Sequence, residues 1–158
     1  MPTANCKPPR LTTIEGRLAP RSREMHHQRK LRIATIQALF QFDVQGDEFA
    51  DKTEEFLRTQ ELSEKDIART SELITHVRER MSEIDSLING ASEHWDLRRI
   101  TPIDRAILRL AICELLFVEA TPPKVAINEA IELAKIFGEA ESPHFVNGLL
   151  DAIWKKSK

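Results

Sequence analysis

The strongest constraint in the sequence is the segment 101–118, where apolar side chains surround nearly the whole axis of a predicted helix. Thr101 and Pro102 form its start, because proline is tolerated in a first helical turn whose amides lack helical partners. A helix that is apolar around almost its whole axis must be covered on all sides. The rest of the chain therefore has to build a core around this segment.

Four charged side chains interrupt this apolar segment. Asp104, Arg105 and Arg109 favour a solvent-facing stripe, and we expect Arg109 in particular to be exposed. Glu114 lies one turn beyond apolar neighbours. We therefore expect Glu114 to be partly buried and paired, with Lys124 as the candidate partner.

Two helix start and stop patterns follow directly. Pro122 and Pro123 open the first helix, and Gly138 is expected to end it in a left-handed conformation. Ser142 is expected to cap the second helix, with a proline after it. The apolar side of the first helix is predicted to be Val125, Ile127, Ala130, Ile131, Ala134 and Phe137, with Glu129, Glu132 and Lys135 opposite.

The rest of the chain also has helical periodicity, and long runs of period two are absent. Gly148 costs a helix about 1 kcal/mol relative to alanine, so we expect it to mark a close approach of two helices. We expect an all-α fold of about seven helices in two small bundles. The other predicted segments are a helix over 22–44, a turn at 45–47, a helix over 48–59, a helix capped by Ser63, a restart at Ser82 and a connection over 94–99.

Charge is distributed unevenly along the chain. Residues 1–32 hold eight of the 23 Lys and Arg but only two of the 25 acids. We read 1–22 as a flexible basic extension and 23–158 as one helical domain. Arg29, Lys30 and Arg32 lie in the first turns of the first predicted helix, where the helix dipole favours acids instead. This cluster therefore indicates either a polyanion-binding surface or a solvated helix end.

Enzyme signatures are absent from the sequence. It has no Gly-rich phosphate loop, no nucleophile elbow and no His-Glu-x-x-His motif. Cys6 and Cys113 lack metal-ligand spacing, and the five histidines give no catalytic pattern. No apolar run is long enough to span a bilayer, and no secretory signal is present. We expect a cytoplasmic, non-enzymatic protein without cofactor, metal, membrane association or small-molecule substrate.

Two stretches carry a family resemblance. Residues 123–135, PKVAINEAIELAK, and 145–148, FVNG, are similar to the signature of the NusB family of transcription antitermination factors. The segment 104–116, DRAILRLAICELL, resembles the family as well, and 29–42 does so more weakly. The resemblance implies a NusB-like fold and RNA binding without catalysis.

The resemblance also implies particular partners and sites. It predicts binding of boxA RNA jointly with NusE, a small-ribosomal-subunit protein, within the transcription elongation complex on ribosomal RNA operons. A partner-binding surface for NusE is expected at Asp104 and Arg105. Phe40 replaces a frequent tyrosine, and Glu141 a frequent aspartate. The RNA-binding residues implied are Arg29, Lys30, Arg32, Gln37, Phe40, Glu141, Ser142, His144 and Phe145.

Two other functions fit parts of the pattern. One is a helical protein-interaction module without RNA binding, whose basic cluster is only a solvated helix end. The other is a NusB-like accessory domain of an RNA methyltransferase, although we expect 158 residues to leave no room for a cofactor-binding domain. Loss of RNA binding on charge reversal would favour the antitermination factor over the first alternative.

Overall fold

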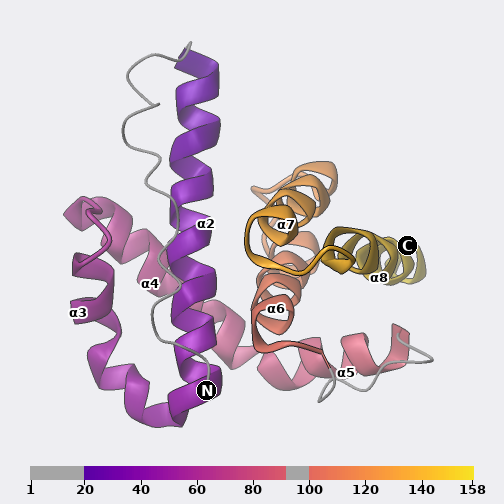
Figure 1. Ribbon diagram of the computed structural model, residues 1–158, viewed down its shortest axis with the longest axis horizontal. Coiled ribbons are helices and arrows are strands. Elements are labelled where there is room, and N and C mark those ends of the chain that lie inside the picture. The colour runs from indigo at the N-terminus through magenta and orange to yellow at the C-terminus, as the bar shows by residue number, and fades with distance from the viewer. Residues whose placement is uncertain (1–19, 92–99) are drawn as a thin grey trace. The chain divides into compact units, whose positions relative to one another are not determined.

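The computed structural model describes residues 20–91 and 100–158, and all regular elements in these ranges are helical (Figure 1). The expected all-α class is confirmed. The predicted connection 94–99 and most of the extension 1–22 lie outside the described residues. The elements are α2 (Pro20–Gln45), the 3-10 helix η1 (Gly46–Lys52), α3 (Thr53–Arg58), α4 (Glu64–Glu79), α5 (Met81–Ala91), α6 (Pro102–Phe117), α7 (Pro123–Phe137) and α8 (Ser142–Ser157).

The chain divides into two compact units, Met1–Ser71 and Glu72–Lys158. In the first unit, α2 packs against η1 and α3. Phe49 links these elements: its ring lies edge-on to Phe42 at 5.0 Å between centroids and to Phe56 at 5.6 Å. Such edge-to-face pairs add to the stabilisation that apolar burial supplies.

The turn after α2 differs from the prediction of one helix over 48–59. Gly46 has a φ of +77°, a conformation that glycine adopts without steric cost. Directly after it the chain winds into the 3-10 helix, and only from Thr53 does it become α-helical. The predicted turn and helix are therefore a 3-10 helix joined to a short α-helix.

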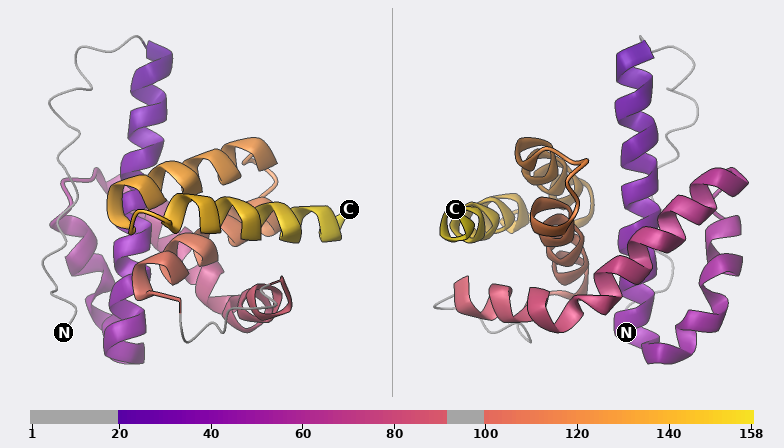
Figure 2. Two further views of the ribbon diagram at one scale, coloured as in Figure 1. Left: turned by 45° about the vertical axis from the view of Figure 1, so that its right-hand side comes forward. Right: turned by 180° about the vertical axis from the view of Figure 1, so that it is seen from behind.

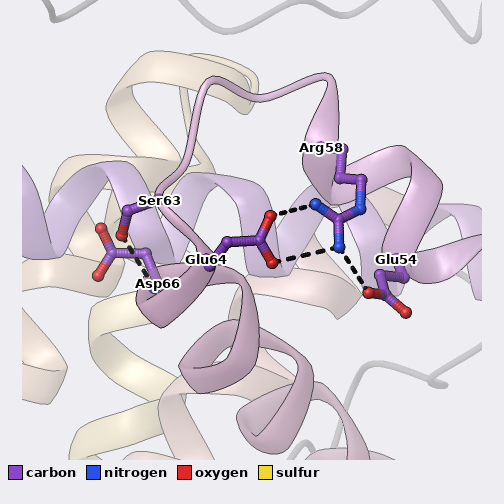
Figure 3. Close-up of polar contacts among 5 residues, drawn as sticks. All are labelled: Glu54, Arg58, Ser63, Glu64 and Asp66. Carbon is purple, nitrogen blue, oxygen red and sulfur yellow. Dashed lines mark hydrogen bonds and ion pairs between the residues drawn. The ribbon is translucent and has the colours of Figure 1, made fainter.

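The turn between α3 and α4 is held by polar contacts (Figure 3). The Ser63 hydroxyl accepts a hydrogen bond from the Asp66 amide at 3.1 Å, which confirms the predicted cap. Arg58 donates to Glu54 at 2.8 Å and also pairs with Glu64, across the turn. These contacts fix the end of α3 against the start of α4.

In the second unit, α6, α7 and α8 pack against one another, and α5 contacts α6 and α8 (Figure 2). Residues 106–115 of α6 are all buried, as its all-round apolar pattern predicted. Burial also raises the pKa of the Cys113 thiol to about 12. A break at Arg80 separates α4 from α5, and α5 begins at Met81, one residue before the predicted restart at Ser82.

The expected exposure of Arg109 is wrong. Arg109 is 8% exposed, and its guanidinium donates to both carboxylate oxygens of Asp85 on α5, each at 2.9 Å. This bidentate ion pair neutralises the Arg109 guanidinium, because an unpaired charge in the core would be strongly destabilising. Glu114 is buried more completely than expected, and it accepts a hydrogen bond from the Thr121 hydroxyl at 3.1 Å. Its pairing with Lys124 remains a prediction.

Two expectations for α7 and α8 are also wrong. The buried side of α7 is rotated from the predicted stripe, so Glu129 is buried while Val125 is 41% exposed. Gly148 is exposed, and a Cβ added there meets no heavy atom within 4 Å. Close helix packing therefore does not explain this glycine.

Candidate nucleic-acid interface

A narrow accessible strip runs along an otherwise buried part of α2. Between residues 31 and 39, only Arg32 and Gln37 are partly exposed, and the other side chains are buried. Arg29 and Phe40 are partly exposed at either end. Spacings of three, eight and eleven residues from Arg29 place the four side chains on one side of a helix. Together with Lys30, they form what we call the α2 strip: Arg29, Lys30, Arg32, Gln37 and Phe40.

The basic end of the α2 strip contacts the turn before α4. The Lys30 ammonium donates to the Glu61 carbonyl oxygen at 3.3 Å. One turn earlier, His27 Nε2 lies 3.1 Å from the Asp66 carboxylate. α2 begins at Pro20, so Arg29 lies nine residues further along the helix, beyond the first turn where the helix dipole acts. The positive charge of the α2 strip therefore comes from its basic side chains. The arrangement favours a polyanionic ligand.

The start of α8 forms a second group, which we call the α8 turn: Glu141, Ser142, His144 and Phe145. Glu141 and His144 are exposed and Phe145 is partly exposed. Ser142 is only 4% exposed. The α8 turn thus offers a carboxylate, an imidazole and part of an aromatic ring to solvent, while its serine points into the unit.

Ser142 does not cap α8 as expected. Its hydroxyl accepts a hydrogen bond from the Glu139 amide at 2.9 Å, which lies before the helix, and donates to Asp104 Oδ2 at 2.9 Å. Its backbone is already the first residue of α8. The side chain therefore ties the α7–α8 connection to α6.

Gly138 also differs from its predicted role. Its φ is −88° and its ψ is −176°, which is extended backbone and not the left-handed conformation. A Cβ at this position would lie 2.5 Å from Ser142 Cβ and 2.6 Å from Ser142 Oγ. Glycine is therefore required by space, because the serine side chain occupies the place that a Cβ would take.

Asp104 and Arg105, expected to contact a protein partner, both make internal contacts. Asp104 is 6% exposed, and burial raises the pKa of its carboxyl group. Its amide donates to the Thr101 hydroxyl at 3.3 Å, which confirms the predicted start of α6. Arg105 is partly exposed and donates to the Ile100 carbonyl oxygen at 2.8 Å. A role in partner binding remains a prediction for both.

The expected sites thus fall into an α2 strip in the first unit and an α8 turn in the second. Sequence reasoning missed that Gly138, Glu139 and Asp104 belong with Ser142; a glycine four residues before a serine was the available signal. Across 20–91 and 100–158, no cluster of His, Cys, Asp or Glu is arranged to hold a metal ion. None of the helices in these two ranges is both long and apolar enough to cross a membrane.

Comparison with known proteins identifies the family. The NusB family model matches residues 29–155. A transcription antitermination protein NusB from Shewanella baltica is 44% identical over 126 residues, covering 80% of this chain and 93% of that protein. The structure of T. maritima NusB aligns with a TM-score of 0.72 at 40% identity, covering 81% of this chain and 90% of that chain.

A further solved structure extends the likeness in fold. The antitermination factors NusB and NusE in complex with dsRNA align with a TM-score of 0.75 at 23% identity, covering 84% of this chain and 98% of that chain. At this identity the likeness concerns the fold alone. The family model and the 44% identical relative together span most of the chain. The chain therefore belongs to the NusB family.

Proposed function

We propose that this protein is a transcription antitermination factor that binds boxA-type leader RNA together with NusE. In this role it supports transcription of ribosomal RNA operons, acts without catalysis and works in the cytoplasm, where bacterial transcription takes place. Membership of a family whose curated relatives are antitermination proteins supports the assignment. The observation that carries it is the composition of the α2 strip.

The α2 strip has the chemistry that a single-stranded RNA requires. Arginine and lysine bind phosphates, and arginine adds a planar fork that matches phosphate oxygens. The amide oxygen of Gln37 is buried, so its amide nitrogen is the group proposed to contact the edge of a base. Phe40 has a ring on which a base can stack. Because their neighbours on α2 are buried, these side chains are the ones that this part of the helix presents.

The α8 turn is a second candidate contact region for RNA. His144 and Phe145 lie in the first turn of α8, where they offer an imidazole and an aromatic ring. Glu141 repels phosphate, so its role is to accept hydrogen bonds from base amino groups. Ser142 is buried, so it takes part through its contacts with neighbouring residues.

NusE is the proposed protein partner. The fold neighbour solved with NusE and dsRNA gives precedent for joint binding by a protein of this architecture. Asp104 is buried, so within the predicted partner site Arg105 is the side chain available for contact at the start of α6. When this protein and NusE both contact one RNA, the two modest interactions reinforce each other. Joint binding therefore suits an RNA-binding strip as small as the one on α2.

Charge reversal tests the RNA-binding proposal. Arg29→Glu, Lys30→Glu and Arg32→Glu combined should weaken binding to a boxA-type RNA by at least about tenfold and reduce the salt slope by about two to three. The matched control reverses three exposed lysines near the C-terminus of α8: Lys155, Lys156 and Lys158. Equal losses in both variants would indicate general electrostatic attraction in place of the α2 strip.

Aromatic truncation separates stacking from charge. Phe40→Ala and Phe145→Ala should lower affinity by about 1–3 kcal/mol each while leaving the salt slope unchanged. Phe49→Ala is the control for core packing, because that ring is only 3% exposed. Unaltered RNA affinity per folded molecule in both test variants would remove the aromatic contacts from the site. Binding of NusE without any RNA binding would instead favour the protein-interaction module.

A further inference from the structure

We propose that Asp104 is a positioning residue for RNA binding, because it holds the α8 turn through the hydroxyl of Ser142. This inference rests on the proposed function and adds to it a residue that does not itself contact RNA. It changes the role expected for Asp104 from a surface contact with a protein partner to an internal support.

A continuous chain of contacts joins Asp104 to the RNA-binding turn. Asp104 Oδ2 accepts a hydrogen bond from Ser142 Oγ at 2.9 Å. Ser142 Oγ in turn accepts a hydrogen bond from the Glu139 amide at 2.9 Å. Since Ser142 opens α8, the same side chain links α6, the α7–α8 connection and the helix that carries His144 and Phe145.

The space around Ser142 restricts the turn further. A Cβ on Gly138 would lie 2.5 Å from Ser142 Cβ, so the two residues are packed as closely as glycine allows. The Gly138 amide donates to the Ala134 carbonyl oxygen at 2.9 Å, which anchors this side of the turn to the end of α7. Ser142 is thus held by a hydrogen bond to α6 and by contact with the backbone after α7.

The start of α6 does not need a buried carboxylate. The Thr101 hydroxyl already accepts from the Asp104 amide and so caps the helix. Asp104 is 6% exposed, and its Oδ1 is buried without a hydrogen bond within the described structure. Burying a polar group in this way costs stability, and the raised pKa of Asp104 reflects the same burial. Support of Ser142 is the benefit that offsets this cost.

The consequence for binding is geometric. His144 and Phe145 can meet the RNA productively only if the first turn of α8 has a fixed position and direction. Without the Asp104–Ser142 bond, the Glu139 amide loses an ordered acceptor and the turn gains alternative conformations. Binding then has to select one of these conformations, which lowers the apparent affinity.

Four variants of the full chain test this proposal. Asp104→Ala and Ser142→Ala each remove the bond, whereas Asp104→Asn keeps a carbonyl acceptor at the same place. Asp85→Ala is the control, because it breaks the pair with Arg109 in the same unit without touching the turn. The measurements are affinity for a boxA-type RNA oligonucleotide per folded molecule and hydrogen exchange of the Glu139 amide.

We expect Asp104→Ala and Ser142→Ala each to weaken RNA binding by roughly three- to tenfold, the equivalent of one hydrogen bond. The double variant should lose little more than either single one, since both remove the same bond. Exchange at Glu139 should accelerate in both, while Asp104→Asn stays within about twofold of the parent affinity. Asp85→Ala should bind like the parent once corrected for the folded fraction.

Two results would overturn the proposal. One is parental affinity in Asp104→Ala with a protected Glu139 amide. The other is an Asp104→Asn variant that binds as poorly as Asp104→Ala, because the acceptor would then not be what matters. If Asp104→Ala does not fold, Ser142→Ala and Asp104→Asn carry the same comparison. A parent that binds no RNA defeats the proposed function itself, which distinguishes that failure from a failure of Asp104 to position the turn.

Discussion

Replacing Gly138 with alanine should destabilise the second unit, although backbone arguments alone predict the opposite. The φ and ψ of Gly138 are accessible to any residue. On that ground Gly138→Ala should stabilise the fold by about 0.4–1 kcal/mol, because alanine restricts the unfolded chain. The new Cβ, however, would lie 2.5 Å from Ser142 Cβ and 2.8 Å from the Ala134 carbonyl oxygen.

The steric cost is the larger of the two effects. Neither the Ser142 Cβ nor a backbone carbonyl can rotate away, so the turn itself has to move. Overpacking of this kind costs about 1–3 kcal/mol. Set against the backbone gain, the expected net loss is about 1–2 kcal/mol. In a chain of this length, such a loss lowers the melting temperature by roughly 2–8 °C.

Gly148→Ala is the matched control for this prediction. Gly148 lies inside α8 in the same unit, and a Cβ there meets nothing within 4 Å. The same substitution should therefore raise stability by about 0.5–1 kcal/mol, through helix propensity alone. Urea unfolding followed by circular dichroism measures both. Stabilisation of comparable size by Gly138→Ala would refute the close contact with Ser142.

Three further predictions concern buried polar groups and a helix cap. Arg109→Ala should lower the free energy of unfolding by about 3 kcal/mol in urea titrations, because it leaves the Asp85 carboxylate unpaired; a loss below about 1 kcal/mol would contradict this. Burial raises the pKa of the Asp104 carboxyl group in the folded state. At a pH between the unfolded and folded pKa values, the folded state therefore keeps a proton that the unfolded state has released. Parent stability should therefore fall relative to Asp104→Asn as pH rises from about 4 through the folded pKa, and pH-independent stability differences would argue against the raised pKa. Ser63→Ala should cost about 1 kcal/mol in the same titrations, and no loss would show that the contact with the Asp66 amide is not a cap.

Local patterns predicted the helices well, since a helix is specified by residues within a few positions of one another. The burial of α6 followed from its all-round apolar character, and the Ser63 cap from a serine three residues before an acid. Arg109 was misplaced because its partner, Asp85, lies 24 residues earlier, beyond any helical repeat. Periodicity indicates which side of a helix is apolar, but it cannot identify the charged residue on another helix that pairs with Arg109.

The candidate site shows the same division. Arg29, Lys30 and Arg32 could be singled out as a basic cluster near the start of a predicted helix, although α2 begins at Pro20 and places them in its third and fourth turns. The contrast between Gln37 and its buried neighbours needed the fold, because a glutamine at helical spacing has no distinctive signal. The contact of Asp104 with Ser142 spans 38 residues and depends on how α6 meets the α7–α8 connection. No local rule could have paired these two side chains.

Burial of Cys113 has a consequence for chemical durability. Oxidants and alkylating agents react with the nucleophilic thiolate form of cysteine, and a pKa of about 12 leaves almost no thiolate at neutral pH. The thiol is also 0% exposed in the middle of α6. Cys113 should therefore resist hydrogen peroxide while the second unit is folded and react only when the unit opens. The rate at which Cys113 is alkylated should therefore report how often the core around α6 opens.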